Sequence, residues 1–197
     1  IVYSQYVGGI VVRKMIFLAL VIVMSASLAF AQTGGGIGIY SDTQGVDCNL
    51  WDTMAGLANY YIVHVAIPGS ITGATAAQFS APAPACLTAM WLSDTTVWPV
   101  TIGTSQTGVA IGYGSCWALP LHILTMNYFT SGTTPPCCTY RVLPDPTTGQ
   151  IDAVDCNGTL LPGTGMCAIV NPDASCPCWA TPVEDTTWGK VKSIYGQ

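Results

Sequence analysis

Charge is scarce in this sequence. Only 8% of its 197 residues are charged, and these comprise five basic and ten acidic residues. A surface that neutralises nucleic-acid phosphates needs many basic side chains, so the shortage argues against a nucleic-acid partner. Disordered segments combine low hydrophobicity with high charge, whereas half of this chain is apolar and its mean hydropathy is +0.47. The composition therefore predicts a folded globular protein.

Catalytic and cofactor motifs are also missing. The only histidines, His64 and His122, each lie in an apolar, strand-like segment, a setting typical of structural histidines that are hydrogen-bonded. Residues 103–108 miss the G-x-S-x-G nucleophile elbow by one residue, and the glycines at 34–38 are not followed by the Lys-Ser/Thr of a phosphate loop. We predict no catalytic residue and no cofactor. An enzyme would need one of the histidines beside an acid in a cleft.

One long apolar run stands near the N-terminus. Residues 15–31 close on Ala29-Phe30-Ala31, the small-x-small pattern that signal peptidase cuts, and Arg13-Lys14 precede them. A start at Val12 gives a conventional signal peptide, with residues 1–11 as an over-extended reading frame. The alternative is a membrane anchor, but the run is short for a bilayer span of about 20 residues. We expect cleavage before Gln32, secretion to the cell surface, the extracellular space or the periplasm, and no membrane span afterwards.

All nine cysteines follow the predicted signal peptide. An exported chain meets an oxidising compartment, which favours disulfides. Zinc ligands usually follow C-x2-4-C spacing, and adjacent or one-apart thiols fit it poorly. The odd cysteine is expected to be Cys167, in an apolar run, as a buried free thiol. The sequence does not fix the pairing of the other cysteines, which are Cys48, Cys86, Cys116, Cys137, Cys138, Cys156, Cys176 and Cys178.

Segments rich in β-branched and aromatic residues recur after the signal peptide. The clearest spans residues 59–67 and ends at the turn signal Pro68-Gly69. Their short, regular spacing without intervening helices predicts an all-β, antiparallel β-sandwich. The other predicted strands occupy residues 37–40, 88–92, 97–102, 108–113, 121–129, 140–143, 150–154 and 166–170.

Two segments have helical features. Residues 74–79 are alanine-rich but lie between a glycine and a proline, so they are expected to form a single turn or an edge strand. Near the C-terminus, Trp188, Val191 and Tyr195 share one face of a short predicted helix. This helix either docks on the domain or serves as an export or attachment signal. The predicted organisation is a leader at 1–31, a sandwich core at 32–143, a Cys-rich completion at 144–180 and a tail at 181–197.

The succession of strands resembles that of cohesin-like, Ig-related sandwiches in secreted bacterial proteins. The resemblance rests on the segments Tyr61-x-Val63-His64-Val65, Ala77-x-Phe79, Gly108-Val109-Ala110-Ile111-Gly112-Tyr113 and Ile123-Leu124-Thr125-Met126. The later cysteine-containing elements and the ending Thr187-Trp188-Gly189 look like those of exported proteins of environmental bacteria. The resemblance implies a face or rim that is presented to protein partners or glycans.

Aromatic and acidic residues supply the remaining candidate sites. Trp91 and Trp98 flank a loop that contains Asp94, a position from which both indoles reach a rim; stacking on sugars and core packing are the two interpretations. Asp42, Asp47 and Asp52 recur every five residues and are weak calcium candidates, with solvated turn acids as the favoured interpretation.

Three functional classes follow. The preferred one is a non-catalytic extracellular module for adhesion, surface display or assembly, which binds a protein partner or a second copy through exposed sheet edges. The second is a carbohydrate-binding module that uses Trp91 and Trp98. The third is a secreted hydrolase.

Overall fold

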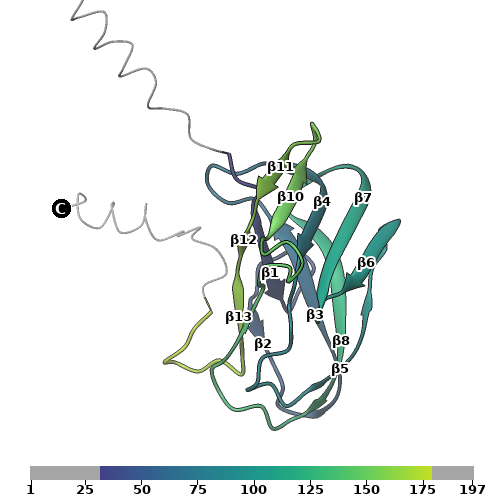
Figure 1. Ribbon diagram of the computed structural model, residues 1–197. Coiled ribbons are helices and arrows are strands. Elements are labelled where there is room, and N and C mark those ends of the chain that lie inside the picture. Colours follow the sequence, from purple (N-terminus) through teal and green to yellow (C-terminus); the bar gives the residue numbers. More distant parts are fainter. Residues whose placement is uncertain (1–31, 179–197) are drawn as a thin grey trace, which may run out of the picture. The chain divides into compact units, whose positions relative to one another are not determined.

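The computed structural model describes residues 32–178, which form strands and no helix (Figure 1). None of these residues forms a helix long and apolar enough to cross a membrane. The strands are β1 (Gly36–Tyr40), β2 (Asn49–Leu50), β3 (Ala55–Val65), β4 (Gly73–Phe79), β5 (Met90–Thr95), β6 (Val100–Thr104), β7 (Gly108–Ala118), β8 (Leu121–Ser131), β9 (Cys138–Arg141), β10 (Asp152–Asp155), β11 (Leu160–Pro162), β12 (Thr164–Gly165) and β13 (Cys167–Val170).

Two five-stranded sheets make up the sandwich. Their strand orders are β12-β1-β3-β8-β5 and β11-β10-β4-β7-β6, and a third sheet has the order β2-β13-β9. Neighbouring strands run antiparallel, except that β12 runs parallel to β1 and β2 runs parallel to β13. Strands from the Cys-rich part of the chain thus join all three sheets. The predicted all-β sandwich is confirmed.

Alternation along the long strands creates the core. In β7, Val109, Ile111 and Tyr113 are buried, whereas the residues between them are partly exposed. Successive side chains of a strand point to opposite faces, so this pattern places one face of the sheet against the other sheet. Tyr128 and Tyr140 lie within the core and share a hydrogen bond of 2.6 Å between their hydroxyl groups, which satisfies two polar groups that water does not reach.

The expectation for residues 74–79 was wrong. They belong to β4, which lies inside its sheet between β10 and β7 rather than at an edge. Ala74, Ala77 and Phe79 are buried on one side of the strand, which is hydrogen-bonded to both neighbours. Pairing with two neighbours overrides the helix propensity of alanine, which is a weak preference.

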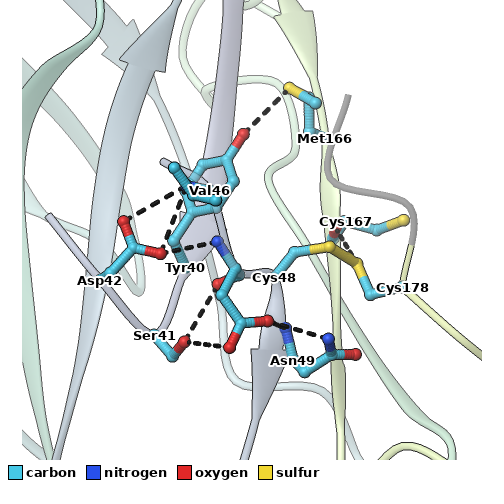
Figure 2. The surroundings of a disulfide bond; sticks show 10 residues. Tyr40, Ser41, Asp42, Val46, Cys48, Asn49, Met166, Cys167 and Cys178 are labelled. Atoms are coloured by element: carbon cyan, nitrogen blue, oxygen red, sulfur yellow. Dashed lines mark hydrogen bonds between the residues drawn. A yellow bond between two sulfur atoms is a disulfide. The ribbon is translucent and has the colours of Figure 1, made fainter. Parts of the chain in front are cut away.

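Four disulfides cross-link the sandwich. The pairs are Cys48–Cys178, Cys86–Cys138, Cys116–Cys156 and Cys137–Cys176. All nine cysteines lie within the described residues, and Cys167 is the one without a disulfide, as predicted, but it is partly exposed rather than buried. Figure 2 shows the Cys48–Cys178 bond, where the Cys178 sulfur lies 3.5 Å from the carbonyl oxygen of Cys167. The predicted leader (1–31) and the predicted tail helix lie outside the described residues.

Candidate interaction surface

The outward face of the β11-β10-β4-β7-β6 sheet carries an apolar trough. Strand register aligns side chains in two rows that cross all five strands. One row is Leu160, Val154, Ala76, Gly112 and Val100, and the other is Pro162, Asp152, Gln78, Ala110 and Ile102. We call the hollow formed by these rows the apolar trough; its lining is almost entirely apolar.

The trough is hollow because its central strands present small residues outward. Ala76 on β4 and Ala110 and Gly112 on β7 form the floor. Larger aliphatic side chains stand on both sides, with Ile102 69% exposed on β6 and Leu160 64% exposed on β11. Large exposed apolar side chains gathered on one face are a feature of interaction surfaces.

Charge is absent from the exposed part of the trough. Residues 32–178 contain eight aspartates and one arginine. Only Asp47 and Asp173 among these aspartates are exposed; they lie before β2 and after β13. Asp152 lines the trough but is 8% exposed. The trough therefore offers shape and apolar contact to a partner, and no exposed ionic group.

A smaller apolar row lies on the outward face of the other sheet. Leu57, Phe129 and Met90 are direct cross-strand neighbours and are all exposed. The adjacent position holds Asn127, whose amide donates to the Ser93 carbonyl at 3.2 Å. This row consists of large side chains only, so it serves as a comparison surface for the trough.

The tryptophans predicted as stacking candidates are engaged within the domain. The Trp91 indole N–H donates to Asp94 at 3.0 Å, and the Trp98 indole N–H donates to the His122 carbonyl at 3.2 Å. The Trp98 ring also packs against Tyr113 and Trp117, with ring centroids 5.2 and 5.5 Å away. Both side chains are partly buried. Their contacts are those of packing residues.

Asp94 joins the two sheets. Its carboxylate accepts hydrogen bonds from the backbone N–H of Ser105 at 2.5 Å and from the Ser105 hydroxyl at 2.9 Å. Ser105 is fully buried in the turn between β6 and β7, while Asp94 lies on β5 of the opposite sheet and not in the predicted loop. The carboxylate therefore satisfies a buried donor and holds the two elements together.

The three calcium candidates do not converge. Asp42 accepts from the backbone N–H groups of Gln44 and Asp47 and from that of Val46 (Figure 2), so it orders its own loop. Asp52 is buried and accepts from the Gly132 N–H and the Thr134 hydroxyl. Within residues 32–178, the only cluster of metal-type ligands is Cys137, Asp173 and Cys176, and its two sulfurs form a disulfide. Disulfide sulfurs are not thiolates, so they are poor metal ligands.

The two histidines differ in burial. His64 is fully buried between the Gly34 carbonyl at 2.7 Å and the Tyr113 hydroxyl at 3.2 Å. Burial lowers its pKa, although the hydrogen bond to Gly34 opposes this. His122 is partly buried, 3.0 Å from the Thr125 hydroxyl. Neither ring is hydrogen-bonded to a carboxylate within the described part of the chain, so neither has the orienting acid of a catalytic triad.

The apolar trough was not predicted from the sequence. The alternation in residues 108–113 places Ala110 and Gly112 opposite Val109, Ile111 and Tyr113, and this pattern predicts a strand with one small-residue face. A sequence does not show that Ala76 lies beside Gly112 and Val100 on the same row, because these pairings join distant segments. Trp188, Val191 and Tyr195 of the predicted tail helix lie outside the described residues.

No protein-family model and no curated protein matches the chain. Its structure is similar to solved cohesin modules. The sixth cohesin of scaffoldin B from Acetivibrio cellulolyticus, solved in complex with a mutant Cel5 dockerin, is 14% identical, with a TM-score of 0.46 over 72% of this chain and 100% of that one.

Two further similar structures are cohesins from other organisms. A non-cellulosomal cohesin of Archaeoglobus fulgidus is 7% identical, with a TM-score of 0.44 over 71% of this chain and 91% of that one. The cohesin module of a Clostridium perfringens family 33 glycoside hydrolase is 8% identical, with a TM-score of 0.42 over 70% of this chain and 98% of that one. These likenesses concern the fold alone.

Proposed function

We propose that this chain is a secreted, non-catalytic β-sandwich module for adhesion, surface display or assembly, and that its apolar trough binds a protein surface. The observation that carries the proposal is the trough itself, with exposed Val100, Ile102 and Leu160 around a floor of alanine and glycine. Exposed apolar side chains that gather around a hollow, rather than standing singly, are a feature of interaction sites.

The chemistry of the trough defines the partner. Because the trough has no exposed charge, an aliphatic and uncharged protein surface fits it better than a charged peptide. Branched side chains of the partner fill the space above Ala76 and Ala110, and Val100 and Ile102 contact them from one side. Carbohydrate binding through Trp91 and Trp98 has weaker support, because both indole N–H groups are already used inside the domain.

Peptide selection tests this proposal because it requires no identified partner. Phage-displayed peptides are selected on the exported, oxidised chain, and their affinities are then measured for Ala110→Lys and for Leu57→Lys as the matched control. Lysine at 110 fills the trough with a charge, so we expect at least about a tenfold loss, or 1.4 kcal/mol, for the selected peptides. Lysine at 57 lies on the other sheet and leaves affinity unchanged.

Equal binding to the wild-type chain and to Ala110→Lys contradicts the proposal. Recognition of a glycan array that is lost on Trp91→Ala and Trp98→Ala, together with no selected peptide, would favour the carbohydrate-binding alternative.

A further inference from the structure

The outer edge strands of the two large sheets are not equally protected. β5 has a register shift between Trp91 and Ser93 and carries Asp94. β11 has three residues and ends in Pro162, and β12 has two residues. Short length, bulges, charge and proline are the usual devices that stop an edge from pairing with another chain.

β6 has no register shift, no charged side chain and no proline within its five residues, although Gly103 has a left-handed φ of 88°. Its sequence, Val100–Thr104, is VTIGT; it pairs regularly with β7 and, within the described residues, with no strand on its other side. The first four residues are exposed, including Val100 at 51% and Ile102 at 69%. Valine, isoleucine and threonine favour extended structure. The free edge therefore presents backbone N–H and C=O groups on a segment well suited to a further strand.

We infer that a second copy of this chain pairs antiparallel with β6, edge to edge. This inference rests on the proposed function and names a partner for the free edge beside the trough. In the centred register, Ile102 faces Ile102, Thr101 faces Gly103 and Val100 faces Thr104, so all five residues of β6 are used. The contact is two-fold symmetric and consumes the free edge of both copies, so it produces a dimer and not a fibre.

The absence of charged side chains on β6 favours a second copy at this edge over a charged partner. The described residues carry eight aspartates and one arginine, so two copies repel each other over most approaches. At β6 there is no charged side chain, and the exposed Asp47 and Asp173 lie before β2 and after β13. The edge is thus a place where two acidic copies meet without juxtaposing like charges.

Pairing also enlarges the apolar trough. The two β11-β10-β4-β7-β6 sheets become one continuous sheet, with the β6 strands at its centre. Ile102 of each copy then gains an apolar neighbour across the new strand pair, which reduces its contact with water. The two troughs lie side by side on the resulting face.

Charge exchange at residue 102 tests the register. Sedimentation velocity is measured over a range of concentrations for the exported, oxidised chain in a Cys167→Ser background, which removes disulfide-linked dimers. We expect a monomer–dimer equilibrium for this chain, monomers for Ile102→Lys alone and for Ile102→Glu alone, and dimers when these two variants are mixed, because unlike charges then face each other.

Matched controls separate pairing from folding. Leu57→Lys changes a similarly exposed aliphatic residue on the other sheet and leaves the dimer intact. Thermal unfolding of each variant checks that the fold is retained. Dimerisation of Ile102→Lys as strong as that of the wild-type residue, or a mixture of the Lys and Glu variants that stays monomeric, overturns the inference.

The outcomes also separate this inference from the proposed function. A chain that is monomeric at every concentration but binds trough-selected peptides overturns the second-copy inference and leaves the proposed function standing. A chain that dimerises through residue 102 but yields no trough-dependent peptide supports the inference and counts against binding in the trough.

Discussion

β5 and β6 follow each other in the chain and end two different sheets, yet only one of them is closed to partners. β5 is bent by a register shift, and its Asp94 is hydrogen-bonded to Ser105. β6 runs without a shift and has no charged side chain. The difference shows that the molecule protects one edge with the same carboxylate that ties the sheets together, and leaves the other edge open beside the apolar trough.

Removing the carboxylate of β5 should have the largest effect on stability. In Asp94→Ala the buried N–H and hydroxyl of Ser105 lose their acceptor, and an unsatisfied buried group costs about 1–3 kcal/mol, with more for charged partners. We expect a loss of about 3 kcal/mol in denaturant unfolding. Asp94→Asn keeps an acceptor oxygen and should lose less. Equal stability of Asp94→Ala and wild type would show that the hydrogen bonds between Asp94 and Ser105 contribute nothing to the free energy of unfolding.

A side chain at position 103 should disturb β6 itself. Gly103 has a φ of 88°, and an added Cβ would collide with the carbonyl oxygen of Gly108 on the paired strand. Such a strained residue costs about 1–3 kcal/mol, so Gly103→Ala should destabilise by about 2 kcal/mol and weaken dimerisation. At Gly112 a Cβ meets Val100 at an ordinary 3.4 Å, so Gly112→Ala is the matched control and should keep or improve stability. Calorimetry compares the stabilities of Gly103→Ala and Gly112→Ala, and equal stability of the two variants would contradict the predicted strain at Gly103.

Acid should affect the fold but not the β6 contact. Burial holds the pKa of His64 below its usual 6.5, so below that pH the unfolded chain binds a proton that the folded chain does not. The free energy of unfolding should therefore fall as the pH drops through 6.5, and His64→Gln should flatten this dependence. β6 has no titratable side chain, so the dimer dissociation constant should stay constant while the protein remains folded. Thermal unfolding and sedimentation are both measured from about pH 7.5 to about pH 5.5, on either side of the ordinary histidine pKa. The first series tests the predicted loss of stability, and the second tests the constant dissociation constant.

A charged residue introduced on the edge strand β6 should have the smallest effect on stability. Thr101 is exposed, and Thr101→Lys places on this edge the residue that commonly guards edge strands. An exposed substitution of this kind changes stability by about 0.5 kcal/mol or less. We nevertheless expect the variant to be monomeric by sedimentation. A Thr101→Ser control should retain the dimer, and a dimeric Thr101→Lys would speak against pairing along β6.

Much of the fold can be predicted because alternation is a local property. The runs at 59–67, 108–113 and 121–129 lie within β3, β7 and β8, apart from the last two residues of the first run. Residues 74–79 were misassigned because their alanines become a central strand only through pairing with β10 and β7. Local sequence does not contain that information.

The disulfides and the site show the same limit. The predicted presence of disulfides is confirmed, but their partners depend on tertiary structure: the adjacent Cys137 and Cys138 bond to Cys176 and Cys86. Cys137 has a φ of 62°, a left-handed turn that no sequence pattern indicated. The trough and the free edge likewise arise from which strands are neighbours, and spacing along the chain does not reveal that.

Hydrogen exchange of the two edge strands, followed as a function of protein concentration, tests the contrast between them most directly. Backbone amides of residues 100–104 should become more protected as the concentration rises, because a second copy bonds to the free edge of β6. Those of residues 90–95 in β5 should exchange at the same rate throughout. Exchange in β6 that does not change with concentration, or protection that appears in β5 instead, would contradict an open β6 edge that a second copy closes.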